Sequence, residues 1–420
     1  MGSISSLSPR LWRRMTNWAA AQFFSGPDQV ADGAMSGEAE EQARRAATAD
    51  APIIWLLGNV QSGKSSIVQR LTGASQAEIG EGFKPVTRSA AIFDFPAEAP
   101  LLRFLDSRGL GERGYDPSAD LAACEDKAQL LIVVMRVSDH RQEAVMQALQ
   151  GIRGRHRDWP VIVAQTWLHA LYADPVAHVQ PYPFTGGVLD ADLPGVPADL
   201  SRALMHQRTL FATVPGSGPI LFVPLDFTTA DDGLPPTDYG LQALLAAIEA
   251  AAPEAVRARL SSLRSVEAAE IGTRAQSLIL GYAFAAATAD VVPALGTVAV
   301  PSIQGAMLHA LSRRFNVNWS RANIIAFVGS LGTATLVRYG LGFGLRELIK
   351  LIPVYGQITG AAAAASASFA FTYALGRAAC VYLAARRRGQ TAGDAEVIQA
   401  YTAGLRSAFD LFHHRQQNRT

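Results

Sequence analysis

Between residues 51 and 250, short and nearly continuous apolar runs alternate with stretches in which apolar residues recur at helical spacing. Continuous apolar runs are typical of strands buried on both faces, and the helical spacing is typical of helices packed on them. This alternation predicts an α/β domain over residues 51–250, with a mostly parallel sheet and helices on both faces. The predicted strands are Ile53–Leu57, Ser89–Phe95, Leu101–Asp106, Leu130–Val137, Val161–Thr166 and Ile220–Asp226. The predicted helices are Ser65–Leu71, Ala119–Lys127, Gln142–Arg155, Ala198–Phe211 and Leu241–Ala250.

After Pro253 the pattern changes to alanine-rich segments that keep helical spacing, and β-branched runs of strand length stop. Helices that follow an α/β region without further strands indicate a separate all-α domain. We therefore expect a hydrophobic helical domain over residues 251–415. Its predicted helices are Glu254–Leu280, Val300–Phe315, Ser320–Gly340, Gly344–Leu351, Gly356–Arg388 and Asp394–His413.

The chain begins with a predicted amphipathic helix, which we assign to residues 1–24. Apolar residues recur at helical spacing over residues 10–24, and Arg10, Arg13 and Arg14 cluster at the start of that stretch. The arrangement suits an anionic membrane surface, and it suits equally a helix that packs on the protein. Residues 25–50 are polar, charged and rich in small residues, which predicts a linker or a loose helix.

A second membrane signal lies in the helical domain. Residues 351–376 contain no charged residue, and the stretch is long enough to cross a hydrocarbon core of about 30 Å. Three arginines follow at 386–388, which would lie on the cytoplasmic side of a span. Small residues at 356, 360, 364 and 368 would allow close helix packing. Because an alanine-rich run is only marginally favourable for insertion, a buried helix of a water-soluble domain is the alternative.

Composition narrows the classes of partner. Of the 420 residues, 49% are hydrophobic and only 17% are charged, which favours membrane contact or unusually buried helices. The formal net charge is +1, so bulk electrostatics give no case for a nucleic-acid partner. The two cysteines, Cys124 and Cys380, are far apart and lack a metal-binding context, which indicates a reducing compartment.

The candidate chemistry begins directly after the first predicted strand. Residues 58–65 read Gly-Asn-Val-Gln-Ser-Gly-Lys-Ser, a complete G-x-x-x-x-G-K-[S/T] phosphate loop between a strand and a helix. Its glycines let successive N–H groups point at phosphate oxygens, Lys64 would reach the β- and γ-phosphates, and Ser65 would hold Mg²⁺. The predicted phosphate-binding residues are Gly58, Asn59, Val60, Gln61, Ser62, Gly63, Lys64, Ser65 and Ser66.

Two later positions would complete a magnesium site with Ser65. The strand that ends at Asp106 continues as Asp-Ser-Arg-Gly, so Asp106 could hold Mg²⁺ and the Gly109 N–H could contact the γ-phosphate. Thr87 lies in the segment 82–88 before the preceding strand, and its hydroxyl could complete the Mg²⁺ shell when the γ-phosphate is present. A surface turn at Asp106–Gly109 and a strand-capping Thr87 are the structural alternatives.

In chain order these motifs resemble the Era-like branch of the TRAFAC class of P-loop GTPases. The resemblance covers residues 51–250, and it implies that the chain binds GTP and GDP with Mg²⁺. The stretches 289–293, 304–307, 351–356 and 374–377 resemble a helical domain of unknown function that follows the GTPase domain in a group of bacterial proteins. The architecture is similar to that of dynamin-like and immunity-related GTPases. It implies a homo-oligomer in the bacterial cytoplasm, associated with or inserted in the inner membrane.

The resemblance breaks down at the base-reading motif. Where the family has [N/T]-K-x-D after the fifth strand, this chain has Thr166-Trp167-Leu168-His169. Thr166 and His169 are the predicted base-binding residues, and Trp167 could stack on a purine or be a packing residue. A neutral histidine offers one acceptor nitrogen, so it cannot reproduce the two contacts that the family's aspartate makes with guanine. Asp226, at the end of the last strand, is expected near the base.

Hydrolysis requires a group that orients water against the γ-phosphate. The residue after Gly109 is Leu110, so we assign the catalytic roles to Lys64, Thr87 and Gln61. The alternatives to Gln61 are the pair Arg108 and Arg113, a monovalent cation, or a second protomer. The sequence therefore predicts a membrane-associated GTPase with slow turnover that acts as a switch or mechanochemical element. A nucleotide-gated scaffold without hydrolysis and an ATPase are the other hypotheses.

Overall fold

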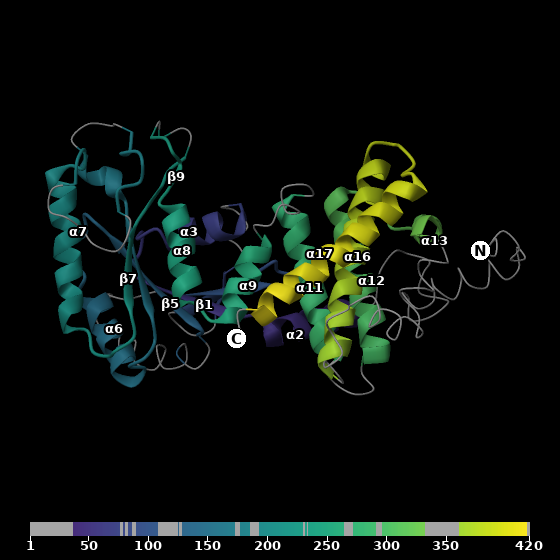
Figure 1. Cartoon of the computed structure of the whole chain (residues 1–420), viewed down its shortest axis with the longest axis horizontal. Coiled ribbons are helices and arrows are strands. Elements are labelled where there is room, and N and C mark those ends of the chain that lie inside the picture. Colours follow the sequence, from purple (N-terminus) through teal and green to yellow (C-terminus); the bar gives the residue numbers. More distant parts are fainter. Residues whose placement is uncertain are drawn as a thin grey trace, which may run out of the picture. The chain divides into compact units, whose positions relative to one another are not determined.

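The structure is a computed structural model of the chain. It describes residues 37–75, 79, 83–85, 90–107, 125, 128–172, 177–184, 193–229, 232, 234–263, 272–290, 296–331 and 361–417. The helices predicted over residues 10–24 and 344–351 lie outside these residues, as does the helix predicted over residues 119–127 apart from Glu125. The chain divides into two compact units (Figure 1). The α/β unit comprises Pro52–Ala97 and Leu102–Ser261, and the helical unit comprises Met1–Ala51, Glu98–Leu101 and Ser262–Thr420.

The α/β unit contains a seven-stranded sheet in the order β2-β3-β4-β1-β5-β6-β7. Strands β4, β1, β5, β6 and β7 are parallel, whereas β2 and β3 extend the sheet in antiparallel fashion. All six predicted strands form, and the mostly parallel sheet is confirmed. The bounds are β1 Ile53–Leu57, β2 Phe83–Pro85, β3 Ala90–Phe95, β4 Leu102–Ser107, β5 Leu130–Arg136, β6 Val161–Thr166 and β7 Ile220–Pro224.

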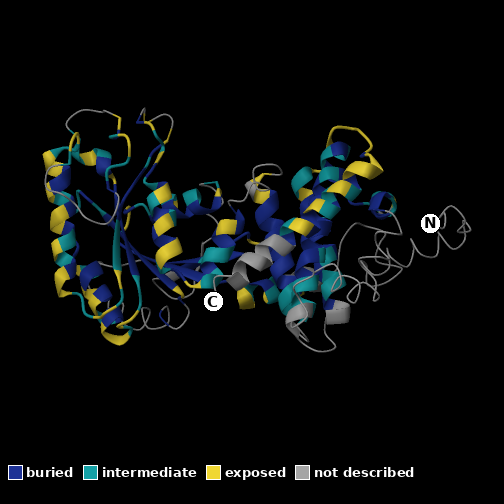
Figure 2. Cartoon of the chain, in the orientation of Figure 1, coloured by how far each residue is buried: buried dark blue, intermediate teal, exposed yellow. Residues whose placement is uncertain are grey.

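Helices cover both faces of this sheet. Helices α3 and α8 lie on one side, and α6 and α7 lie on the other (Figure 1). From α6, Leu149 and Ile152 are fully buried in one cluster with Trp55 of β1, and burial of each such side chain is worth about 1.5–3 kcal/mol. The strands form the buried centre of the unit (Figure 2). The helix bounds are α3 Lys64–Thr72, α6 Glu143–Arg155, α7 Ala198–Leu210, α8 Leu241–Ala251 and α9 Glu254–Leu263.

The short elements of this unit were not predicted. They are the three-residue strand β2, the hairpin of β8 (Asp226–Phe227) and β9 (Asp238–Tyr239), and the 3-10 helices η3 (Leu168–Leu171) and η4 (Phe211–Thr213). Elements this short contain too few residues to show a hydrophobic period. Hairpin β8–β9 is anchored by α3, because Arg70 Nη2 donates to the carbonyl oxygens of Thr228 (2.6 Å) and Thr237 (2.9 Å).

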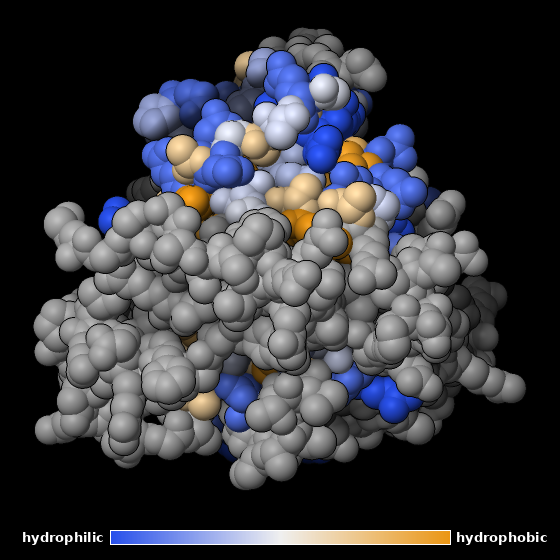
Figure 3. All heavy atoms as spheres, turned by 90° about the vertical axis from the view of Figure 1, so that its right-hand side faces the viewer, coloured by the Kyte–Doolittle hydropathy of each residue, from blue (hydrophilic) through white to orange (hydrophobic). Residues whose placement is uncertain are grey.

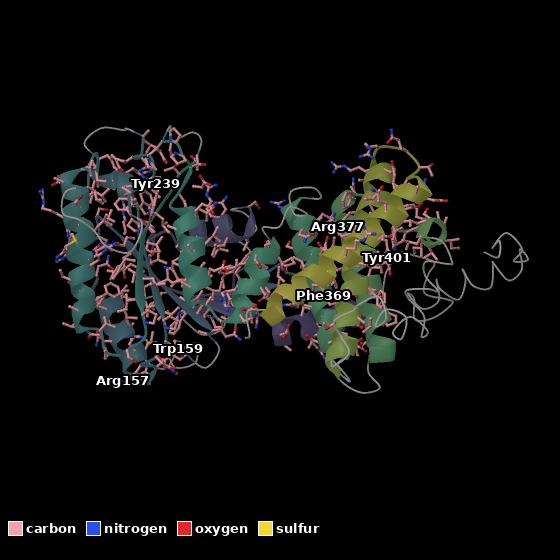
Figure 4. The ribbon with its side chains drawn as sticks, viewed as in Figure 1. Arg157, Trp159, Tyr239, Phe369, Arg377 and Tyr401 are labelled. Atoms are coloured by element: carbon pink, nitrogen blue, oxygen red, sulfur yellow. The ribbon has the colours of Figure 1, made fainter. Side chains whose placement is uncertain are left out.

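The helical unit is built around α16. Helices α11, α12 and α17 all pack against it, and α2 packs on α11 and α12. Figure 2 shows α11 and much of α16 as buried, and Figure 4 labels Phe369, Arg377 and Tyr401 among its side chains. The bounds are α2 Gly37–Asp50, α11 Thr273–Asp290, α12 Gly296–Phe315, α13 Arg321–Leu331, α16 Ala361–Arg387 and α17 Asp394–Gln417.

Two details differ from the expected helices. The single helix predicted over Glu254–Leu280 is wrong, because α9 ends at Leu263 and α11 begins at Thr273. Gly272 precedes α11 with a left-handed φ of 84°, a conformation that glycine adopts without steric cost and that a continuous helix excludes. Part of the predicted linker, Gly37–Asp50, forms α2, whose alanines and early glutamates favour a helix.

Close packing in the helical unit depends on small residues and polar pairs. A Cβ atom on Gly281 of α11 would lie 1.9 Å from the carbonyl oxygen of Ala99, so only glycine permits this approach. From α16, Tyr373 Oη accepts a hydrogen bond from Gln276 (2.9 Å), and Ser368 Oγ donates to Asp290 Oδ2 (2.7 Å). These bonds satisfy polar groups that are buried in the unit.

Helix α16 also carries the apolar stretch from which a membrane span was predicted. Within the described residues it is the one helix long and apolar enough to cross a membrane, over Ala364–Arg387. Of its most apolar window, 78% is buried inside the structure, as expected of a core helix. Length and composition alone therefore do not separate a membrane span from a core helix at this position.

Candidate nucleotide-binding site

The phosphate loop connects β1, which ends at Leu57, to α3, which begins at Lys64. Gly58 is required by a close approach to the neighbouring strand, because a Cβ atom there would lie 2.3 Å from the carbonyl oxygen of Val134. Gly63 is the N-cap of α3 and has a left-handed φ of 99°. The loop therefore adopts a wrapped backbone that two of its glycines make possible.

Lys64, the first residue of α3, is buried. Its Nζ donates to the carbonyl oxygens of Gly58 (2.8 Å) and Asn59 (2.7 Å) and lies 3.5 Å from Asp106 Oδ1. Asp106 is on β4, directly beside β1, where it pairs with Leu56 in the sheet register. The sheet thus brings together the lysine and the carboxylate of two motifs that are far apart in sequence.

The start of α3 provides the other groups that an anion and a metal require. The first N–H groups of a helix have no intrahelical acceptor, and no side chain caps α3 because its N-cap residue is Gly63. They carry partial positive charge, which suits a phosphate group. Ser65 presents an exposed hydroxyl in this first turn, and with the Asp106 carboxylate it offers the oxygen ligands that Mg²⁺ prefers.

Two side-chain contacts fix the loop to its neighbours. Thr166 Oγ1, at the end of β6, donates to the carbonyl oxygen of Ser62 (2.6 Å). Asn59 Nδ2 donates to Asp139 Oδ2 (2.9 Å) and to the carbonyl oxygen of Arg141 (2.8 Å), in the segment after β5. From the sequence, Thr166 was predicted to bind the base and not to fix the loop. Asp139 was not predicted, because nothing in the local pattern connects it to the loop. The phosphate loop is therefore attached to the end of β6 and to the segment after β5, the two strands nearest to β1 on this side of the sheet.

The loop after β6 contains the residues that replace the base-reading motif. Trp167 has a left-handed φ of 64° and is 37% exposed, and the Arg136 guanidinium lies 4.2 Å from the centre of its ring. His169 follows in η3, with its ring centre 5.5 Å from that of Trp167. The His169 main-chain N–H donates to Asp226 Oδ2 (2.7 Å), and Nδ1 of its ring lies 2.6 Å from the same oxygen. Asp226, which was predicted to lie near the base, contacts this loop through His169.

Behind Asp226 lies a buried cluster of aromatic side chains. His178 stacks on Tyr239, its Nδ1 lies 3.1 Å from the Tyr172 hydroxyl, and its Nε2 lies 3.5 Å from Asp226 Oδ2. Burial lowers the pKa of His178 and, together with the charge of Asp226, raises the pKa of Tyr172 to about 12. The side chains of His178 and Tyr172 are therefore neutral near pH 7.

The described residues place most of the predicted site in one region. Gly58–Ser66, Asp106 and Thr166 meet at the carboxyl ends of the parallel strands, where ligands bind in open α/β sheets. Gln61 is exposed with a left-handed φ of 60°, and Val60 is 70% exposed. Thr87 and Gly109 lie outside the described residues, as do Arg108, Leu110 and Arg113.

Comparison with known proteins is consistent with this geometry. Residues 53–166 match the family model described as 50S ribosome-binding GTPase. The match spans the phosphate loop, Asp106 and Thr166, and the chain therefore contains a P-loop GTPase domain. None of the curated proteins matches the chain.

Solved structures of GTPases are also similar to this chain, at low TM-scores. A bacterial selenocysteine-specific elongation factor is 16% identical over 48% of this chain and 28% of its own, with a TM-score of 0.29. A GTP-binding protein from Sulfolobus solfataricus in complex with GDP is 14% identical over 47% of this chain and 51% of its own, with a TM-score of 0.27. This chain thus spans about half or less of the length of these two proteins.

Proposed function

We propose that this chain binds GTP and Mg²⁺ at the phosphate loop and hydrolyses GTP slowly, as a nucleotide-dependent switch or mechanochemical element. The observation that carries the proposal is the buried Lys64, whose ammonium group lies against the loop carbonyls of Gly58 and Asn59 and 3.5 Å from Asp106. The family match over residues 53–166 supports the guanine nucleotide as ligand.

Ser65 and Asp106 would hold Mg²⁺, and Thr87 would complete its shell as predicted from the sequence. Bound there, the ion would neutralise charge on the β- and γ-phosphates. Ser65 supplies its hydroxyl from the first turn of α3, and Asp106 supplies a carboxylate from the end of β4. Direct titration with labelled GTP and ATP, with and without Mg²⁺, tests this assignment. Equal affinity for GTP with and without Mg²⁺ would argue against the metal site.

Turnover should be slow in dilute protein and should rise with protein concentration. Gln61 carries an exposed amide that could orient water, whereas the amide of Asn59 in the same loop bonds Asp139. The exposed position of Gln61 leaves it accessible to a second protomer. A phosphate-release assay over a hundredfold range of protein concentration checks this, with Gln61→Ala beside the unchanged protein. Fast release by dilute Gln61→Ala protein would contradict the role of Gln61. GTP binding without any release would favour the nucleotide-gated scaffold.

Membrane association in the bacterial cytoplasm, and homo-oligomerisation, belong to the same proposal. Support comes from the length and composition of Ala364–Arg387 and from the arginines that end α16. Because most of this helix is buried, insertion would require α16 to exchange its contacts with α11, α12 and α17 for lipid. On the end of the molecule shown in Figure 3, the visible described residues are mostly hydrophilic, with small hydrophobic spots between them.

Nucleotide state should therefore decide whether the protein binds vesicles. We expect flotation with vesicles of anionic lipid to be stronger with a non-hydrolysable GTP analogue than with GDP. The Lys64→Ala protein is the control, since it should float equally under both conditions. Flotation that is absent with every nucleotide would contradict membrane association and leave the nucleotide site untouched.

A further inference from the structure

The loop after β6 has His169 where the family has aspartate, and the contacts of His169 determine which of its ring nitrogens carries the hydrogen. Asp226 is 2% exposed, and its Oδ2 accepts from the main-chain N–H of His169 while Nδ1 of the same residue lies 2.6 Å away. An ionised carboxylate can only accept hydrogen bonds. In the neutral imidazole the hydrogen must therefore be on Nδ1, and Nε2 must carry the lone pair.

The His169 side chain is held in place and is still accessible. The two contacts with Asp226 fix both the main chain and the ring of the residue, and 27% of the side chain is exposed. Thr166, three residues earlier, bonds the carbonyl oxygen of Ser62 in the phosphate loop. The segment from Thr166 to His169 is therefore bonded at one end to the phosphate loop and at the other to Asp226.

We infer that His169 Nε2 reads the purine base through a single acceptor, that Asp226 is its positioning residue, and that the site takes 6-oxopurine nucleotides without reading the 2-amino group. This inference rests on the proposed function, because it assumes that a nucleoside triphosphate occupies the phosphate loop. Of the two donors on guanine, N1–H is the stronger, and it lies at the centre of the base edge. Hypoxanthine shares this donor, whereas adenine presents an acceptor at N1.

The inference predicts ratios of the affinities for GTP, ITP and ATP. A site with an aspartate at position 169 would give different ratios. GTP and ITP should bind within about threefold of each other, because they differ only in the 2-amino group. ATP should bind at least about tenfold more weakly, because two acceptors would face each other and a polar group would stay unpaired. An aspartate accepts from both guanine donors and would penalise ITP.

Substitutions of His169 and Trp167 test the base contact by equilibrium titration with labelled GTP, ITP and ATP at pH 8. His169→Asp should create a preference of about tenfold or more for GTP over ITP. His169→Ala should bring the ratio of the affinity for GTP to the affinity for ATP close to one. Trp167→Ala is the matched control, since any stacking on its exposed ring is tolerant of base identity and the ratios should stay unchanged.

The tautomer of His169 is a separate readout that does not require nucleotide. In protein labelled with nitrogen-15, NMR should show the hydrogen of His169 on Nδ1. Asp226→Asn keeps the side-chain shape and removes the acceptor-only carboxylate, so an Nε2–H signal should appear and the GTP-to-ATP ratio should fall. Asp226→Glu retains a carboxylate and should recover part of that ratio.

The possible outcomes separate this inference from the proposed function. An Nε2–H tautomer in the unsubstituted protein, or an ITP penalty of tenfold or more, overturns the inference and leaves GTP binding intact. A GTP-to-ATP ratio that His169→Ala does not change overturns it as well. If the unsubstituted protein binds none of the three nucleotides, both the proposed function and the inference are overturned.

Discussion

Replacing Lys64 by alanine should weaken binding of GTP at least a hundredfold, which corresponds to about 2.7 kcal/mol. The substitution removes the ammonium group that would contact the β- and γ-phosphates. In the unsubstituted protein this ammonium group lies 3.5 Å from the Asp106 carboxylate. Without it, the carboxylate would lie close to the polyphosphate with no positive charge beside it. Both effects act in the same direction, since an unneutralised carboxylate repels phosphate. Titration of labelled GTP measures the loss directly.

The control for this substitution is a second cation on the same helix. Arg70 of α3 donates to the carbonyl oxygens of Thr228 and Thr237, and it takes no part in the phosphate loop. Arg70→Ala should therefore lower the melting temperature of the protein while leaving the affinity for GTP nearly unchanged. If Lys64→Ala binds GTP as tightly as the unsubstituted protein, the assigned phosphate site is wrong.

Asp106 allows the two effects to be separated. In the absence of Mg²⁺ the carboxylate only opposes phosphate binding, so Asp106→Asn in the Lys64→Ala background should recover part of the lost affinity. In the presence of Mg²⁺ the same double substitution should bind no better than Lys64→Ala, because a metal ligand has been removed as well. A recovery that is equal with and without Mg²⁺ would contradict the assignment of Asp106 as a metal ligand.

Contiguous patterns made the core of the site predictable from sequence. The phosphate loop is one run of residues, and the strand before it is a continuous apolar segment, so both are visible locally. Asp106 could be placed beside Lys64 because parallel strands next to each other end at the same edge of the sheet. In these features the geometry is determined by residues adjacent in sequence or by strands adjacent in the sheet.

Contacts between distant residues were not predictable in the same way. Asn59 bonds Asp139 across a long separation in sequence that no periodicity connects. Asp226 was predicted to lie near the base, but its contact with His169 was not predicted. The membrane signal of α16 failed to discriminate for a related reason, because a core helix and a span have the same composition. What decides between them is the set of helices that packs around α16, and only the folded chain shows that set.

Stability of the α/β unit should depend strongly on one arginine that lies at the other ends of the parallel strands from the nucleotide site. Arg153 of α6 is 1% exposed, and it donates to the carbonyl oxygens of Pro215 (3.0 Å), Gly218 (3.0 Å) and Trp159. Burial lowers the pKa of its guanidinium, and the charge of Asp158 partly offsets that effect. The contacts join the end of α6 to the turns before β6 and β7, where Figure 4 labels Trp159.

Arg153→Ala should therefore lower the free energy of unfolding by about 3 kcal/mol or more. Each partly buried carbonyl that loses its donor costs about 1 kcal/mol, and the missing Arg153 side chain leaves a cavity. The melting temperature of a unit of this size should fall by about 6–12 °C. Lysine carries one ammonium group on a flexible side chain and lacks the planar guanidinium with its several fixed donors. Arg153→Lys should therefore recover only part of the lost free energy of unfolding.

Two comparisons make this expectation specific to the buried contacts. Arg202→Ala removes an exposed arginine of α7 that pairs with Asp199, and it should change the free energy of unfolding by less than about 0.5 kcal/mol. Because Arg153 is remote from Lys64 and makes no contact with the phosphate loop, the Arg153→Ala protein should bind GTP with nearly unchanged affinity below its melting temperature. Chemical and thermal unfolding, followed by circular dichroism, measure the stability. An unfolding curve equal to that of Arg202→Ala would show that the three carbonyl contacts do not stabilise the unit.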